Sequence, residues 1–507
     1  MTQAVPEMTP YSTVVPFVSS LPTWMTPYDA QRVSAYQIYE QIYWNVPETF
    51  RLQMRGSDED PIYIPTGRTI VDTTNRYLAR DFAYTIEADV GTPADQQLLD
   101  SALRMLFRRE RFWSKFAANK RYGLIRGDWL WHITANDAKP AGTRIKIEAL
   151  DPASYFPVFE SDVQDGGDPD KVVAVNIVEM VVVDEVTYIK RQTYTKGADP
   201  STNDGSDTKI YNSIGYFDPK AWEDIRLKPV KAVKPPTPLP DQITSIPVYH
   251  IRNIEAPSDP FGSSELRGVE RVLAGINQGI SDEELALALE GLGMFATDGG
   301  PPKDASGQIT DWILGPGSVA EHAPGSKFER ITGIGTVKPM IDHLDWVMTH
   351  GVKEPTGTPD AAIGKVDVSV AESGISLILQ LGPMLAKVSE KEQVITDVMR
   401  QMLFDLSQMW LPAYEGISTE ASAVPIYGDT LPQNKEQQVT EIISMAQAGL
   451  VDGEWARQEI ARIRGYNFDE GMAARILTEQ QERARATDPF AERMSGELEI
   501  GQPGTTT

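Results

Sequence analysis

The sequence contains no cysteine among its 507 residues, which excludes disulfide bonds, thiolate metal sites and cysteine nucleophiles. Basic residues are also few, because 47 Lys and Arg stand against 72 Asp and Glu and give a formal net charge of −25. Affinity for nucleic acid comes mainly from Lys and Arg that neutralise phosphates. A chain this acidic should therefore repel nucleic acid overall, although the same acidity also serves solubility.

Long apolar runs are missing as well. No run approaches the roughly 20 residues that cross a bilayer, and the start of the chain has neither a basic segment nor a compact apolar one. We therefore expect no secretory signal and no membrane partner. With 41% hydrophobic and 23% charged residues, the composition is that of a globular protein. The length suggests about two to four domains.

The sequence lacks the common catalytic and nucleotide-binding motifs. It has no GxSxG nucleophile elbow. GTPDAAIGKV (357–366) is not a phosphate-binding loop, because six residues instead of four separate its glycines and Val follows its Lys. GIGTVK (333–338) lacks the third glycine of a dinucleotide fingerprint. Carboxylate pairs are plentiful, so a hydrolytic pair stays open, although no pair stands out.

Histidine is a common metal ligand. The chain has five: His132, His250, His322, His343 and His350. His343 and His350 are seven residues apart and can share a helix face, but there is no HExxH spacing and no cysteine beside them. We therefore predict no catalytic residue, no cofactor and no metal site.

Helical periodicity dominates the first part of the chain, after a proline-rich start. We expect helices over residues 29–44, 66–80 and 92–124. The third helix has a strong start signal, with Thr92 as the cap, Pro93 at the first helical position and Asp95 in the first turn.

The third helix also carries a basic run: Arg104, Arg108, Arg109, Arg111, Lys115, Lys120 and Arg121. Such a run fits either DNA binding or a solvated or subunit-facing surface that acidic neighbours balance. We favour the second interpretation, because nucleic-acid binders normally place such a run on a basic domain.

Residues 128–251 are rich in strand signals. In WLWHIT (129–134), Trp129, Trp131 and Ile133 alternate and predict one face of a strand. Further strands are expected within 144–160, 171–183 and 185–195, and at IPVYHI (246–251). The five prolines of 227–242 predict an extended connector. A β-rich region therefore follows an α-rich one.

Two helices separated by a small insert follow. FGSSEL (261–266) predicts a helix start, with Ser263 or Ser264 as the cap, and an apolar stripe continues to the glycines near 293. This helix carries an acidic set: Asp282, Glu283, Glu284 and Glu290. Residues 294–335 are dense in Gly and Pro with short β-like runs, and 337–352 predict a second, shorter helix.

The next segment, PTGTPDAAIGKVDVSVAESG (355–374), has small residues and no aromatic ring, which predicts a mobile loop. Its charged residues are Asp360, Lys365, Asp367 and Glu372. A long amphipathic helix follows, and Pro383 inside it should produce a kink. Three short helices are expected within 435–487, including the phrase AGLVDGEWA (448–456). The end of the chain lacks periodicity and predicts disorder.

This order of elements resembles the core of portal proteins from tailed double-stranded DNA bacteriophages, in particular the siphophage, actinobacteriophage-like family. The phrases FGSSEL, PTGTP-to-AESG and AGLVDGEWA carry the resemblance, which covers roughly residues 29–487. It implies an α+β portal fold with an α/β wing, a two-helix stem, a small β-containing clip, a long kinked helix and a helical crown.

The resemblance also implies domain limits: an extended or disordered arm (1–28), the wing (29–260), the first stem helix (261–293), the clip (294–335), the second stem helix (336–354), the tunnel loop (355–374), the kinked helix of the wing (375–430), the crown (431–487) and a disordered tail (488–507). The charged residues of 355–374 would then face DNA, and the acidic set of 261–293 would line a channel.

The function implied is a non-enzymatic one. Portals form a ring, expected to have twelve subunits, at one capsid vertex of the virion, and the ring is assembled in the host cytoplasm. It conducts DNA during packaging and ejection. The implied partners are further copies of the chain, double-stranded DNA, the terminase, the major capsid protein and the head–tail connector. An acidic wall would let DNA slide without a deep binding minimum.

Three other functions stay open on the sequence. The chain could be another head–tail connector or a minor capsid ring protein, although the order of its elements argues against this. A soluble acidic hydrolase would need a pocket with paired carboxylates. A DNA-binding module would retain DNA in a salt-sensitive manner.

Overall fold

The computed structural model divides the chain into two compact units, Met1–Thr430 and Leu431–Thr507. The structure describes residues 27–53, 61–87, 89–159, 172–197, 209–217, 231–256, 259–292, 294–298, 306–309, 325, 327–331, 337–365, 374–428, 435–451, 453–464 and 478. The predicted N-terminal arm therefore lies mostly outside the described residues, and the predicted C-terminal tail lies wholly outside them.

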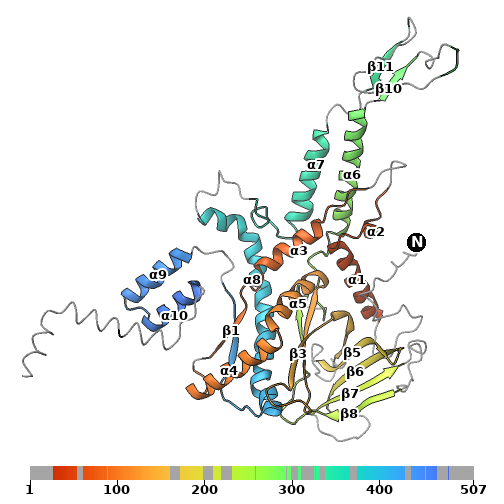
Figure 1. The fold of residues 1–507 in the computed structure, drawn as a ribbon. Coiled ribbons are helices and arrows are strands. Elements are labelled where there is room, and N and C mark those ends of the chain that lie inside the picture. Colours follow the sequence, from red (N-terminus) through yellow and green to blue (C-terminus); the bar gives the residue numbers. More distant parts are fainter. Residues whose placement is uncertain are drawn as a thin grey trace, which may run out of the picture. The chain divides into compact units, whose positions relative to one another are not determined.

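The sheets of the first unit are antiparallel, and most of their strands lie in one stretch between helices, so the fold is α+β as predicted (Figure 1). Its helices are α1 (Pro27–Tyr43), α2 (Pro47–Phe50), α3 (Thr66–Tyr77), α4 (Pro93–Arg109), α5 (Phe112–Arg126), α6 (Glu270–Leu292), α7 (Lys338–Met348) and α8 (Gly374–Asp405). Short π-helical segments, Thr349–Lys353 and Leu406–Glu415, continue α7 and α8. In the described part of the chain, no helix is long and apolar enough to cross a membrane.

The strands form four sheets. The strand bounds are β1 (Ala83–Ile86), β2 (Asp128–Ala135), β3 (Ile145–Leu150), β4 (Tyr155–Phe159), β5 (Val172–Val183), β6 (Val186–Lys196), β7 (Ile210–Phe217), β8 (Lys231–Pro238), β9 (Val248–Arg252), β10 (Met294–Thr297), β11 (Phe328–Ile331) and β12 (Ala423–Ile426). A three-stranded sheet has the order β3-β2-β9, and a five-stranded sheet has the order β4-β5-β6-β7-β8. The pairs β1-β12 and β10-β11 are separate two-stranded ribbons.

Strand β2 forms where the alternation of Trp129, Trp131 and Ile133 predicted a strand, and it is buried on both faces. Trp131 packs against Phe112 of α5, with ring centroids 4.8 Å apart. Leu130 points to the opposite side and belongs to a core that includes Tyr155 and Ile177 of the five-stranded sheet. Helix α5, strand β2 and the five-stranded sheet therefore form successive layers around one core.

The proline-rich segment predicted as a connector forms strand β8 instead. It pairs with β7 at the edge of the five-stranded sheet, with register shifts between Asn212 and Gly215. An edge strand tolerates proline because one side of its backbone has no ladder partner. Proline at this edge also blocks pairing with a further strand.

The single long helix predicted over 92–124 is wrong, because the chain breaks between α4 and α5. The expected start is confirmed, since Thr92 and Asp95 form a reciprocal capping box. In a continuous helix, Phe112 would point about 140° away from Phe107, because successive residues turn by about 100°. The break places both rings in one core, stacked with centroids 4.5 Å apart.

The second unit contains two described helices, α9 (Lys435–Gln447) and α10 (Gly453–Arg464). They pack against each other, with Ile442 and Ala461 among the buried residues. The third helix predicted for this region lies outside the described residues.

Candidate functional site

The candidate site is a helical hairpin formed by α6 and α7, which run side by side with the β10-β11 ribbon at their far end (Figure 1). The two helices approach closely where Gly351 faces α6. A Cβ at Gly351 would lie 2.9 Å from Cγ1 of Val272, so a larger residue would push the helices apart. Residues 306–309, 325 and the β10-β11 ribbon are the described part of the predicted clip.

The hairpin begins later than predicted, because α6 starts at Glu270 and the FGSSEL segment is not helical. Neither Ser263 nor Ser264 caps α6. Ser264 instead donates from Oγ to the carbonyl oxygen of Ile125 at 2.5 Å, and Glu265 donates from its backbone amide to Leu124 at 3.0 Å. The segment is a buried strap that supplies partners to the C-terminal carbonyls of α5.

A buried charged triad lies where this strap meets α8. The two carboxylate oxygens of Glu265 accept hydrogen bonds from Nζ of Lys391 at 2.6 Å and from Nζ of Lys387 at 2.8 Å. Burial alone would raise the pKa of Glu265, but the two ammonium groups outweigh it and lower the pKa to about 2. The carboxylate is therefore held ionised in the core.

The same two lysines bind three further segments of the chain. Lys387 donates to Thr74 Oγ1 in α3 and to the backbone oxygen of Thr356, both at 2.7 Å. Lys391 donates to the backbone and side-chain oxygens of Asn253 at 3.0 and 2.9 Å. One charged cluster thus joins the strap before α6, the turn after α7 and the helix α8, which fixes both ends of the hairpin to the body of the unit.

An N-terminal segment also lines α6. Backbone amides of Gln53, Ile62 and Ile64 donate to side-chain oxygens of Gln278, Ser281 and Asn277 at 2.7, 2.9 and 3.0 Å, respectively. Sequence reasoning missed this contact. The signal available was a set of amide and hydroxyl side chains beside the apolar stripe of α6, where an apolar or charged residue is more usual.

The predicted acidic channel residues all lie on α6. Asp282 is half-buried and accepts from Nε2 of Gln278 at 3.0 Å, Glu283 is half-buried and Glu284 is exposed. Because successive helix residues point about 100° apart, these three side chains do not share one face. Glu290 also lies in α6, but its side chain is outside the described residues.

The first part of the segment predicted as a mobile loop is instead folded into turns. Residues 355–365 form hydrogen-bonded turns, and Thr358 and Ala362 are buried within them. Asp360 pairs with Lys353 at 2.7 Å, whereas Lys365 is exposed. Asp367 and Glu372 lie outside the described residues.

Helix α8 follows and contains Pro383 as predicted. Figure 1 shows the axis of α8 changing direction in its first part. A proline inside a helix removes one backbone hydrogen bond and crowds the preceding turn, which accounts for a bend of this kind.

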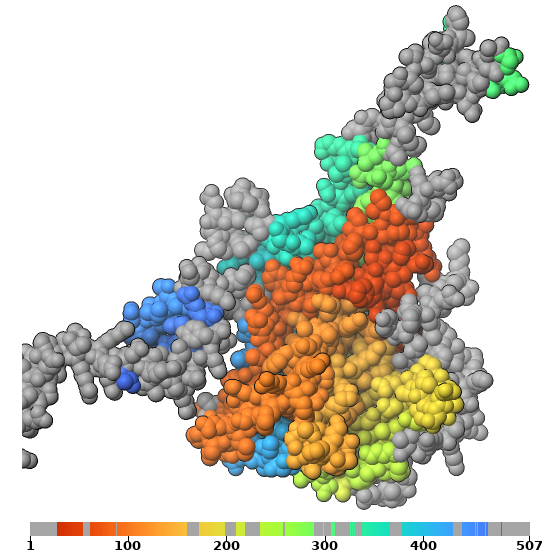
Figure 2. Space-filling model, in the orientation of Figure 1, coloured from red at the N-terminus to blue at the C-terminus, as the bar shows by residue number. Residues whose placement is uncertain are grey.

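Helix α7 presents an unusual surface, because none of its residues is buried. Figure 2 shows its teal atoms beside the green atoms of α6 on the face in view. Trp346 is 59% exposed and Ile341 is 42% exposed. His343 and His350 flank Trp346, with ring centroids 6.4 and 5.0 Å from the indole. His350 also pairs with Glu354 at 2.9 Å. The predicted sharing of a face by the two histidines therefore holds, and it surrounds an exposed tryptophan.

Most of the basic run is balanced by local partners, as we favoured. Arg104 pairs with Asp100, Arg109 and Lys115 pair with Glu110, Arg121 pairs with Asp72, and the buried Lys120 donates to the backbone oxygen of Leu78. Within the described residues, Arg108 and Arg111 have no acidic partner. These two are the part of the run that local pairing does not explain.

A hydrolytic centre finds little support in the described part of the chain. The buried Asp128 accepts from His250 Nε2 at 2.6 Å, from the Gly262 amide at 2.7 Å and from the Tyr36 hydroxyl. This carboxylate therefore holds β2, β9, α1 and the strap together. Among the described residues, no group of three or more His, Asp or Glu is arranged to hold a metal ion.

Comparison with known proteins finds solved structures with a similar fold, but no sequence relative. No protein-family model matches the chain, and no curated protein sequence is similar to it. A solved structure described as "Neck of empty GTA particle computed with C6 symmetry" aligns over 88% of this chain and 96% of that chain, with 13% identity and a TM-score of 0.41. A likeness at this level assigns no function.

Proposed function

We propose that the chain is the subunit of a portal-type ring, which conducts double-stranded DNA and has no enzymatic activity. The exposed helix α7 carries this proposal. A helix without a buried residue that nevertheless bears Trp346 and Ile341 is costly on a monomer, because exposed apolar patches favour association. Neighbouring copies around a ring would cover this surface.

The anchoring of the hairpin supports the same proposal. The triad of Glu265, Lys387 and Lys391 joins both ends of the hairpin to the body of the unit. A projecting pair of helices needs such a rigid base if it is to meet identical hairpins in one fixed geometry. Burial between subunits would also have to offset the self-repulsion of chains that each carry a net charge of −25.

The distribution of charged residues supports the proposed role as a DNA conduit. Glu283 and Glu284 lie on α6 without a basic partner among the described residues, and Lys365 is exposed after the hairpin. Unpaired charges act over about 8–10 Å at cellular salt. Acidic side chains at a channel wall would therefore keep DNA from binding deeply, while the exposed Lys365 makes brief contacts with phosphates.

The remaining assignments follow from this proposal. The ring sits at a capsid vertex of the virion and contacts the major capsid protein. The segment that contains β10 and β11, at the end of the hairpin, receives the terminase during packaging and the head–tail connector afterwards. The second unit takes the place of the crown.

The decisive experiment is negative-stain microscopy of the purified chain, combined with native mass measurement. We expect a ring with an axial hole and a mass near twelve times 56.1 kDa, or a neighbouring multiple. The measurement is repeated at high concentration, because association rises by mass action. A uniform monomer or dimer at every concentration would contradict the proposal.

Changing Trp346 to glutamate tests the surface that carries the proposal. Interface tryptophans often contribute about 2 kcal/mol or more to association, so we expect W346E to shift the population from rings to monomers in sedimentation velocity. Its far-UV circular dichroism should match the wild type, since Trp346 is 59% exposed in the single chain. Trp455 of the second unit is 46% exposed and provides the control W455E, which should still form rings. Equal assembly of both variants would show that α7 is not part of the interface between subunits.

A further inference from the structure

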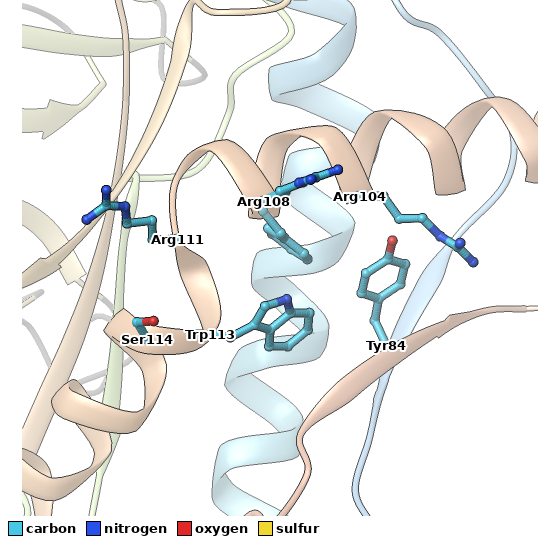
Figure 3. Close-up of a pocket in the computed structure, with 7 residues that line it drawn as sticks. Tyr84, Arg104, Arg108, Arg111, Trp113 and Ser114 are labelled. Carbon is cyan, nitrogen blue, oxygen red and sulfur yellow. The ribbon is translucent and has the colours of Figure 1, made fainter. Parts of the chain in front are cut away.

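A pocket lies at the corner where α4 ends and α5 begins (Figure 3), and nothing in the proposed conduit function uses it. It has a volume of about 390 Å³ and is lined by Tyr84, Arg104, Phe107, Arg108, Arg111, Trp113 and Ser114. Figure 3 shows the rings of Tyr84 and Trp113 close together with the side chain of Arg108 above them, whereas the side chains of Arg104 and Arg111 extend outward on opposite sides. No lining residue is acidic.

The floor of the pocket is rigid. Phe107 meets Tyr84 edge to face at 5.5 Å and Trp113 at 5.8 Å. Phe82 also packs against Trp113, with ring centroids 5.7 Å apart. Trp113 is nevertheless 41% exposed, so one part of it is held by the core and the other part is open to solvent. A preorganised aromatic surface of this kind binds with little loss of side-chain entropy.

The rim of the pocket carries positive charge in a strongly acidic chain. Arg104 is paired with Asp100 at 2.9 Å. Arg108 and Arg111 have no acidic partner among the described residues, although the other basic residues of the run do find local partners. The guanidinium group of Arg108, above the aromatic rings in Figure 3, is suited to bind a carboxylate.

The backbone conformation at Arg111 is unfavourable for an arginine. Its φ of 52° and ψ of 40° are left-handed, a conformation that favours glycine. An arginine at this corner costs conformational energy that glycine would not. A role of the guanidinium group in binding a partner would explain why arginine stands here, because the turn itself does not require this side chain.

We propose that this pocket binds an acidic peptide segment of another protein. A large apolar side chain of the peptide enters between Tyr84 and Trp113. Carboxylates elsewhere in the peptide pair with Arg108 and Arg111. Tyr, Trp and Arg are the residue types that dominate binding energy at protein interfaces. DNA is the less suitable occupant, because two free arginines neutralise few phosphates and the chain carries a net charge of −25.

The test uses the full-length chain and fluorescence anisotropy with labelled probes at physiological salt. The first probe is a short synthetic peptide of Glu and Asp with one central Trp. Two matched peptides replace either the acids by Gln and Asn or the Trp by Ala, and a short DNA duplex is the fourth probe. We expect binding of the first peptide, binding at least about tenfold weaker for the other two, and no binding of DNA.

Two pocket variants separate binding from folding. R108E should weaken binding of the acidic peptide by at least about tenfold. R111G should weaken it similarly, while its thermal stability stays the same or rises, because glycine relieves the left-handed backbone. The control R271E reverses the charge of an exposed arginine on α6 and should leave the affinity unchanged.

Several results would overturn the proposal. One is the absence of wild-type binding to the acidic peptide, and another is equal binding by R108E and R111G. Preferential binding of DNA would assign the arginines to nucleic acid instead. Self-association that R108E abolishes, without peptide binding, would assign the pocket to a second copy of the chain.

Discussion

Replacing Glu265 by glutamine is expected to lower the free energy of unfolding by about 3–5 kcal/mol, because it leaves two buried ammonium groups without their shared carboxylate. In the native structure this carboxylate is 2% exposed and lies 2.6 and 2.8 Å from Lys391 and Lys387. K391M should cost less, since Glu265 then keeps Lys387 as a partner. Urea unfolding followed by tryptophan fluorescence measures both effects.

A matched surface variant shows whether the loss is specific. Glu284 is exposed on α6 and has no basic partner among the described residues, so E284Q should change the unfolding free energy by less than about 0.5 kcal/mol. If E265Q were as stable as E284Q, the triad would not anchor the hairpin. The triple replacement of Glu265, Lys387 and Lys391 by apolar residues should recover much of the loss, because no charge then stays unpaired.

The pH dependence of the same variant follows from the lowered pKa of Glu265. The two lysines bring this pKa from 4.5 to about 2 in the folded chain, against the effect of burial. A depressed carboxyl pKa contributes stability that is present above about pH 4.5 and is lost as the pH falls towards 2. The difference in stability between wild type and E265Q should therefore shrink on acidification, and parallel pH profiles would contradict this assignment.

Local periodicity predicted much of the helical fold. Apolar stripes located α1, α3, α7 and α8, and the cap at Thr92 with Asp95 in the first turn is present as expected. These signals are short-range, because they depend on residues three or four apart in the sequence. They survive in the structure because tertiary packing follows the same stripes.

Pairings between distant segments could not be predicted in this way. Strand β1 pairs with β12, so that Ala83 lies opposite Ile426. The break between α4 and α5 depends on where Phe112 packs, and β8 depends on the free edge of a sheet formed by earlier strands. Each of these features depends on a contact with a distant segment, which the local sequence pattern does not identify.

The candidate site shows the same division. The two helices of the hairpin and the proline inside α8 were predicted from periodicity and composition. The triad was not, because Glu265 was interpreted as a first-turn residue of a helix that in fact begins at Glu270. A usable signal was the pair Lys387 and Lys391, one turn apart beside the apolar stripe of α8, where a buried lysine requires a carboxylate partner.

The strap before α6 leads to the second large expected effect. Changing Gly262 to alanine should destabilise the chain by about 3 kcal/mol or more, or prevent folding, because overpacking against backbone cannot be relieved by a change of rotamer. A Cβ at this position would lie 2.7 Å from the amide nitrogen of Asn253 and 3.0 Å from Cα of Arg252, and closer still to the carbonyl oxygen of Gly127. All three are backbone atoms.

These backbone atoms have little freedom to move, which is why the predicted cost of G262A is high. Asn253 donates its amide hydrogen to Gly127 at 2.8 Å, and the Gly262 amide donates to the buried Asp128 at 2.7 Å. A shift of the strap would therefore break hydrogen bonds at the end of α5 and the start of β2. The control is Gly275 in α6, whose Cβ would meet nothing within 4 Å, so G275A should be neutral or stabilise by up to about 1 kcal/mol. The measurement is the thermal unfolding of the two variants. Equal melting temperatures would show that the strap can move to accommodate the methyl group. The close approach at Gly262 would then not fix the base of the hairpin.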